Sequence, residues 1–157
     1  MKLLAITATL ALTVPVLSHD GHHPAIAKLS NLIGGVWSTK MPDGSAIRVT
    51  YKWMADGHTI LGEGTWTSPN GKVMHTQTLI GMDEEAKKPF YFDTHAGNPV
   101  HGHVTLENGK VVFTFGPAGK PAAYIEEGGF PEKDTYTFTM KDIDGKVLAT
   151  NSLRRTR

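Results

Sequence analysis

The sequence has 157 residues, of which 39% are hydrophobic and 20% are charged. This length accommodates one domain and a targeting segment, and the sequence has neither the composition of a disordered chain nor the run of about 20 apolar residues that a membrane-spanning helix needs. The formal net charge is +1 and cysteine is absent. The sequence therefore predicts no nucleic-acid partner and excludes disulfides, thiolate metal sites and a lipoprotein anchor.

The N-terminus has the features of a cleavable secretory signal. Lys2 supplies a positive start, and Leu3–Val14 is an apolar run of the expected length. Val16 and Ser18 occupy the minus-three and minus-one positions of a cleavage site, so we expect residues 1–18 to be removed. The mature protein would begin at His19, be secreted or periplasmic, and have no membrane anchor after processing. A membrane-anchored or buried N-terminal helix is the alternative.

Residues 19–24 form a polar segment that is rich in histidine. His19, His22 and His23 lie close to the α-amine of the expected mature N-terminus. Imidazole and amine nitrogens suit copper, nickel or zinc, so these residues are candidate metal ligands. The alternative is a solvated tail without a ligand.

Residues 25–33 are predicted to form a short amphipathic helix, because the apolar residues Ile26, Leu29, Leu32 and Ile33 recur at helical spacing. From Gly34 onward, apolar and polar residues alternate, as in half-buried strands. Turn residues separate the runs. The predicted strands cover residues 35–40, 47–53, 59–66, 73–82, 90–95, 100–107, 111–115, 123–127, 135–141 and 146–154.

Two of the connections are predicted to be tight hairpins. Asn108-Gly109 and Asp144-Gly145 suit a type I′ turn, in which both central residues have positive φ. An open meander of about nine or ten strands would expose two edges, and closure removes them. The predicted fold is therefore all-β, an up-and-down antiparallel β-barrel over residues 25–157 with a short N-terminal helix. Such an interior holds side chains or one small ligand.

Several motifs in this order resemble the lipocalin-like (calycin) barrels, and in particular a bacterial group of exported domains of unknown function. They are the G-x-W pattern of Gly35 and Trp37 after a short helix, then Tyr51-Lys52-Trp53, Asp56-Gly57-His58, Leu79-Ile80-Gly81-Met82-Asp83 and Phe90-Tyr91-Phe92. The resemblance covers residues 25–157. It implies a barrel with an interior pocket and leaves the ligand open.

The resemblance also implies that Trp37 packs under an arginine of the last strand, either Arg154 or Arg155. A neighbouring group of similar barrels binds haem through a histidine late in the chain. This sequence departs from that pattern because its last histidine is His103. We therefore expect no cofactor.

The candidate ligand-binding residues are aromatic and polar. In residues 47–53 the apolar stripe ends in Tyr51 and Trp53, which we expect to mark a widening barrel mouth. The other candidates for the apolar wall are Phe90, Phe113, Phe115, Tyr136 and Phe138. The candidates for polar groups inside the barrel are Glu63, His75, Gln77 and His95, for which an outward-facing polar stripe is the alternative. His101 and His103 share one face of a strand and are expected to face solvent.

These features favour an exported barrel that binds a small apolar or amphipathic molecule. One alternative is a metal-handling module that uses the N-terminal histidines. Another is a barrel enzyme that uses Glu63 and His75 in acid–base chemistry. The sequence contains no nucleophile motif and no phosphate-binding motif, so we assign no catalytic residue. It does not indicate the oligomeric state.

Overall fold

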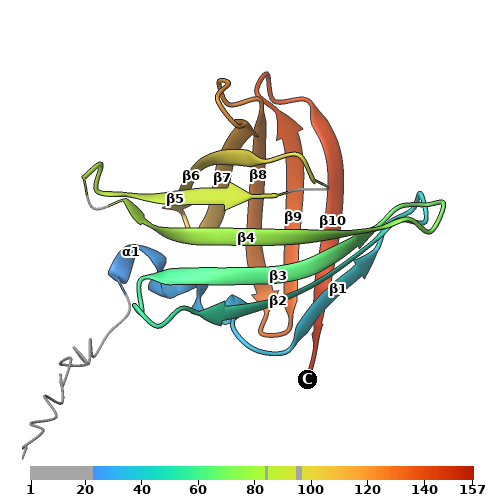
Figure 1. Ribbon diagram of the computed structural model, residues 1–157, viewed down its shortest axis with the longest axis horizontal. Coiled ribbons are helices and arrows are strands. Elements are labelled where there is room, and N and C mark those ends of the chain that lie inside the picture. Colours follow the sequence, from blue (N-terminus) through green and yellow to red (C-terminus); the bar gives the residue numbers. More distant parts are fainter. Residues whose placement is uncertain (1–22, 84, 95–96) are drawn as a thin grey trace, which may run out of the picture.

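The computed structural model describes residues 23–83, 85–94 and 97–157. Within these residues the chain forms a short helical segment and ten strands (Figure 1). The helical elements are α1 (Pro24–Ala27) and η1 (Lys28–Leu32). The strands are β1 (Val36–Lys40), β2 (Ala46–Trp53), β3 (Thr59–Thr67), β4 (Val73–Asp83), β5 (Lys88–Asp93), β6 (Val100–Glu107), β7 (Lys110–Pro117), β8 (Tyr124–Glu132), β9 (Thr135–Asp142) and β10 (Val147–Thr156).

The strands form a closed antiparallel barrel in up-and-down order. Each strand pairs with its neighbours in the chain, and β1 also pairs with β10. At the closure, Trp37 of β1 lies between Arg155 of β10 and Val49 of β2. Closure pairs the two edges that an open meander would expose to other chains. The predicted fold class, strand order and approximate strand number are confirmed.

The helical segment is tighter than the predicted helix. Only Pro24–Ala27 is α-helical, and Lys28–Leu32 continues as a 3₁₀ helix. Residues three apart lie in line along a 3₁₀ helix, and Ile26, Leu29 and Leu32 have this spacing. All three are buried and join the interior core. The segment therefore presents one apolar row to the barrel interior.

Trp37 is fully buried at the end of the barrel that this segment covers. Its indole Nε1 donates a hydrogen bond to the carbonyl oxygen of Leu32 at 2.7 Å. The guanidinium carbon of Arg155 lies 4.7 Å from the centroid of the Trp37 ring, a cation–π contact. The predicted stacking on a C-terminal arginine is confirmed. The partner is Arg155 because strand alternation turns the exposed Arg154 outward.

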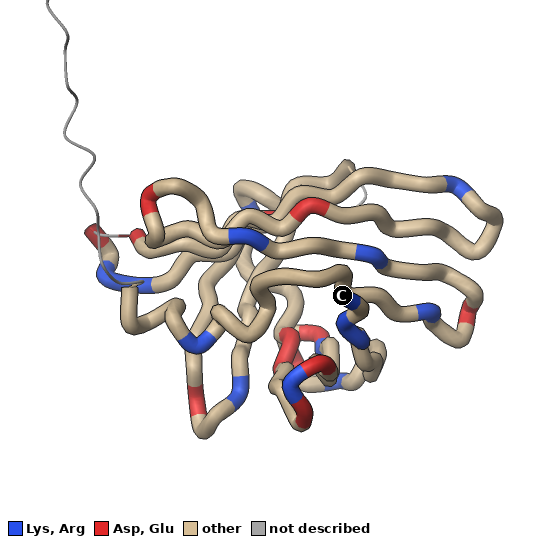
Figure 2. The backbone as a smooth tube through the Cα atoms, turned by 90° about the horizontal axis from the view of Figure 1, so that it is seen from below, with Lys and Arg blue, Asp and Glu red and all other residues tan. Residues whose placement is uncertain are grey.

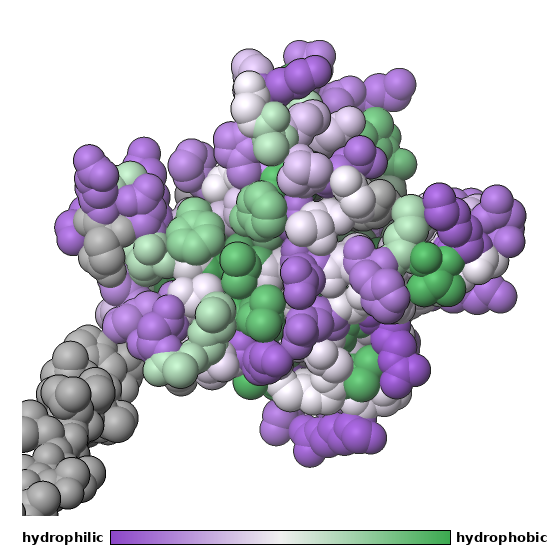
Figure 3. All heavy atoms as spheres, viewed as in Figure 1, coloured by the Kyte–Doolittle hydropathy of each residue, from purple (hydrophilic) through white to green (hydrophobic). Residues whose placement is uncertain are grey.

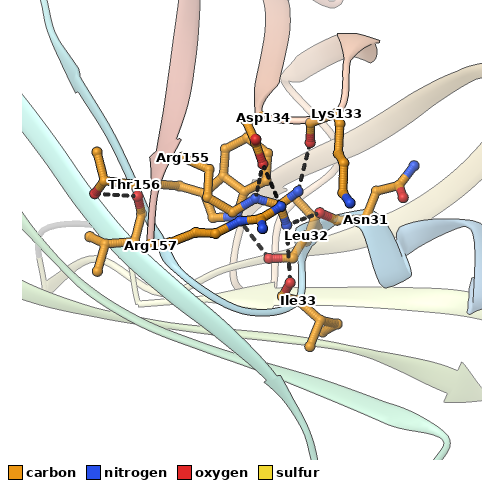
Figure 4. A network of polar contacts seen from close by, with 10 residues as sticks. Asn31, Leu32, Ile33, Lys133, Asp134, Arg155, Thr156 and Arg157 are labelled. Carbon is orange, nitrogen blue, oxygen red and sulfur yellow. Dashed lines mark hydrogen bonds and ion pairs between the residues drawn. The ribbon is translucent and has the colours of Figure 1, made fainter.

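Arg155 also ties three chain segments together at this end (Figure 4). Its guanidinium donates hydrogen bonds to the carbonyl oxygens of Asn31 at 2.8 Å, Ile33 at 3.0 Å and Lys133 at 2.7 Å. Its Nε donates to Oδ1 of Asp134 at 2.7 Å. This side chain thus joins the helical segment and the turn between β8 and β9 to the last strand.

The two predicted type I′ hairpins differ. Asn108 and Gly109 both have positive φ, 49° and 79°, as that turn requires. In the second hairpin only Gly145 has positive φ, so the prediction for Asp144-Gly145 is wrong. There, Gly145 donates a backbone hydrogen bond to Asp142, which makes a longer loop with one left-handed residue at its end.

The outer face of the barrel carries both charged and hydrophobic residues. Figure 2 shows basic and acidic residues interspersed along the chain. Hydrophobic residues gather over β3 to β5 on the face shown in Figure 3. There, the outward-facing Leu61, Leu79 and Phe92 pair across the strands, and the Phe90 ring covers Gly81. No helix of the described residues is long and apolar enough to cross a membrane.

Candidate functional site

The barrel interior contains a cavity of about 130 Å³. Apolar side chains make up most of its wall, including Leu29 and Leu32 of the helical segment and Phe113 and Phe138 of the strands. Because side chains alternate along each strand, every strand contributes every second residue to this interior. The cavity therefore lies where the inner faces of the strands meet the segment that covers one end.

Polar residues also line the cavity, and they come from strands on different sides of the barrel. They include Tyr51 of β2, Thr78 of β4, Tyr91 and Asp93 of β5, Glu126 of β8 and Tyr136 of β9. The two carboxyl groups are each held by a hydroxyl. The Tyr136 hydroxyl donates to Oε1 of Glu126 at 3.1 Å, and the Thr78 hydroxyl donates to Oδ2 of Asp93 at 2.5 Å.

Two glycine residues make room for tyrosine rings that line the cavity. A Cβ atom on Gly128 would lie 2.0 Å from the hydroxyl oxygen of Tyr136, and one on Gly62 would lie 2.7 Å from a ring carbon of Tyr51. Such distances are too short for any side chain. The two glycines therefore let the tyrosine rings lie against the sheet, which leaves the center of the barrel unfilled.

The electrostatics of the cavity are set by burial. Burial raises the pKa of Glu126 to about 7, with a further contribution from the negative charge of Asp93, although the hydrogen bond from Tyr136 lowers it. Burial raises the pKa values of Tyr51, Tyr91 and Tyr136 above their ordinary value, and the negative charge of Glu126 contributes to each shift. The tyrosines are therefore neutral hydroxyl groups at physiological pH, and Glu126 titrates near neutrality.

The described lining of the cavity is acidic. Among the described residues that line it, two are carboxylic acids and none is a lysine, an arginine or a histidine. A buried carboxylate without a cationic partner is costly, which is why burial favours the protonated form of Glu126. No group of three or more histidine and acidic side chains in the described residues could hold a metal ion.

The predicted apolar wall is found in part. Tyr51, Phe113 and Tyr136 line the cavity, as does Phe138. Phe115 and Trp53 pack in the core cluster and are not among the cavity-lining residues. Trp53 ends β2, which contacts η1, so the stripe of residues 47–53 runs toward the end of the barrel that the helical segment covers. The seventh candidate, Phe90, lies on the outer face. Ligand binding by the cavity-lining residues stays a prediction.

The expected inward position of Glu63, His75 and Gln77 is wrong, because all three side chains are exposed on the outer face. Glu63 pairs with Gln77 across β3 and β4 and forms an ion pair with Lys52 at 2.8 Å. His75 lies opposite Thr65 on the same face. The neighbouring glycines of β3, Gly62 and Gly64, face inward, and a residue without a side chain gives no hydropathy signal for alternation.

The histidines do not contribute to the described part of the cavity. His19, His22 and His95 lie outside the described residues. The Nδ1 atom of His23 accepts a hydrogen bond from the backbone of Ala25 at 3.2 Å and so caps α1. His101 and His103 are exposed on the outer face, as predicted.

Sequence reasoning missed the two interior acids, Asp93 and Glu126. Asp93 ends the run Phe90-Tyr91-Phe92-Asp93, in which both faces are aromatic, so alternation does not show which face is inside. Glu126 is followed directly by Glu127. That pair was the available signal, since adjacent residues of a strand point to opposite faces and one of the two must point inward.

Comparison with models of known protein families and with curated proteins finds no match to this chain.

Proposed function

We propose that this protein is a binding barrel for a small, largely apolar molecule with one polar end. The observation that carries this proposal is the interior cavity, in which apolar and aromatic walls surround a few polar groups held in place by hydrogen bonds. Small-molecule sites in proteins combine these two features: the apolar wall gives affinity, and the polar groups orient the ligand.

The size of the cavity limits the ligand. Drug-sized molecules occupy pockets of roughly 300–1,000 Å³, and an engineered apolar cavity of about 150 Å³ binds benzene. The volume of about 130 Å³ therefore suits a molecule close to the size of one small ring or a short branched chain.

We also propose that this barrel is related to the lipocalin-like (calycin) barrels. Its support is the fully buried Trp37 under Arg155, in the G-x-W and last-strand positions that the resemblance implies.

We further propose that the protein is exported after cleavage at Ser18. Mass spectrometry of the protein from its own host tests this: a mature chain that begins at His19 supports it, and a chain that retains residues 1–18 contradicts it.

Titration with isopentanol tests the binding function. This alcohol has one polar end and as many non-hydrogen atoms as benzene. We expect saturable binding by calorimetry, with quenching or enhancement of tryptophan fluorescence because Trp66 lines the cavity. The variant Ile47→Trp adds volume at the cavity wall and should abolish binding, whereas the exposed-site variant Glu63→Gln should bind normally.

Two outcomes would contradict the proposal. One is the absence of saturable binding by the unmodified protein. The other is binding that Ile47→Trp leaves unchanged while circular dichroism shows both variants to be folded.

A further inference from the structure

A second hollow lies on the outside of the barrel, where β1 and β10 separate. The two strands pair at only three positions, from Val36 opposite Thr156 to Ser38 opposite Arg154. Beyond Ser38 the strands run in different directions (Figure 1), and a hollow of about 600 Å³ lies where they part. Small-molecule sites in proteins typically have roughly 300–1,000 Å³, so this hollow has room for one small molecule.

Two arginines and a serine form one row beside this hollow. The register of the sheet places Ser38 of β1 opposite Arg154 of β10 and also opposite Arg48 of β2. Their neighbours Trp37 and Val49 are buried, so by alternation the row faces outward. Because adjacent strands lie about 4.8 Å apart, the Cα atoms of the two arginines are about 10 Å apart. Both long side chains therefore reach an anion bound beside the Ser38 hydroxyl.

The hollow carries positive charge that no acidic side chain balances. Lys40 lines it together with Arg48 and Arg154, and none of the described residues in its lining is acidic. Within the described part of the chain, none of these three cations forms an ion pair.

The other arginines of the chain differ from these two. The sequence has four arginines, and both Arg155 and Arg157 form ion pairs with Asp134. The acid on the outer face of β3, Glu63, is likewise paired, with Lys52 at 2.8 Å. The two arginines that lack an acidic partner among the described residues are therefore the two that flank Ser38.

We propose that this hollow binds the phosphate group of a small organic phosphate. A guanidinium group binds a phosphate through two parallel hydrogen bonds. Two arginines and a lysine match a group that carries about two negative charges near neutral pH, and hydroxyl groups such as that of Ser38 add donors for its three oxygens. A carboxylate has one charge and two oxygens, so it would use fewer of these donors.

The site is separate from the interior cavity. Ile47 and Thr65 border both spaces, but Lys40, Arg48 and Arg154 line only the outer hollow. The apolar side chain of Ile47 gives the organic part of the ligand a surface to contact. The inference therefore goes beyond the proposed function and does not depend on it.

Titration of the full chain with phenyl phosphate tests the inference. The calorimetric measurement is made at pH 8 and low ionic strength, where the phosphate group is doubly ionised and exposed charges are least screened. We expect saturable binding that weakens as salt is added. Benzoate, which has the same ring but one negative charge, should bind at least about tenfold more weakly. Inorganic phosphate should displace phenyl phosphate only at higher concentration, because it has no organic part.

Variants locate the binding. Arg48→Gln and Arg154→Gln should each weaken the binding of phenyl phosphate about tenfold, as the loss of one charge-assisted hydrogen bond allows. The matched control is Arg157→Gln, which removes the same charge directly after β10 but outside the hollow, and should change the affinity less than about threefold. Isopentanol should bind to all three variants as it binds to the unmodified protein.

Three results would overturn the inference. One is the absence of saturable binding of phenyl phosphate to the unmodified protein, and another is binding of benzoate or inorganic phosphate that is equally tight. The third is an equal effect of Arg157→Gln and Arg48→Gln while circular dichroism shows both variants to be folded, because a general attraction of positive charge would then explain the binding. The first two results need no variant, and the separate isopentanol titration distinguishes failure of this inference from failure of the proposed function.

Discussion

Replacement of Arg155 by alanine should destabilise the barrel strongly. The change removes three hydrogen bonds to backbone carbonyls, at 2.7 to 3.0 Å, and a cation–π contact with the buried Trp37. Hydrogen bonds to a charged group contribute roughly 1.5–3 kcal/mol each, and a cation–π contact contributes roughly 0.5–2 kcal/mol. Water can replace some of the lost hydrogen bonds at the exposed carbonyls, so we expect a net loss of about 3–5 kcal/mol.

This loss is large enough to measure by urea denaturation followed through tryptophan fluorescence. In a domain of this size it corresponds to a fall in Tm of roughly 6–20 °C. Two variants act as controls. Asp134→Ala removes only a half-exposed partner and should destabilise far less, because the backbone contacts of Arg155 remain. Arg154→Ala, at the exposed neighbouring position, should change the free energy of unfolding by no more than about 0.5 kcal/mol.

The comparison with Asp134 decides whether the reasoning is right. If Asp134→Ala is as destabilising as Arg155→Ala, the ion pair holds this end of the barrel together, and the hydrogen bonds to the helical segment contribute little. If Arg155→Ala is as mild as Arg154→Ala, the tie between the last strand, the helical segment and the β8–β9 turn has no energetic importance.

Three further outcomes are expected. Gly128→Ala should lower the free energy of unfolding by at least about 2 kcal/mol, because its Cβ atom would overlap the Tyr136 hydroxyl. The control Gly129→Ala, which has nothing within 4 Å of its Cβ atom, should be close to neutral when both variants are measured by urea denaturation. The folded protein holds a proton on Glu126 between pH 4.5 and about 7 that the unfolded chain releases. Stability should therefore fall by up to about 3 kcal/mol as the pH rises through this window, and Glu126→Gln should flatten the profile. Deletion of residues 19–23 should change the Tm by no more than a few degrees in a calorimetric scan, and a larger fall would show that this segment packs on the barrel.

The class of fold could be predicted from the sequence because its signals are local. Alternation from Gly34 onward, turn residues between the runs and a count of about nine or ten strands already favoured a closed antiparallel barrel. The G-x-W motif and the C-terminal arginines predicted the contact with Trp37. The exact arginine was decided by the register of β1 and β10, in which Arg155 and not Arg154 lies opposite Trp37 and shares its face.

The contents of the interior were decided by tertiary structure. Polar residues in a strand are ordinarily assigned to the solvent face, and a sequence does not show where burial is compensated by a distant hydroxyl. Glu126 depends on Tyr136 of the next strand, and Asp93 depends on Thr78 of the strand before it. Glu63, which looked like the unusual acid from its apolar neighbours, is exposed and paired with Lys52. Alternation along a strand is a property of the chain, whereas the choice of which acid lies inside depends on which strands meet across the barrel.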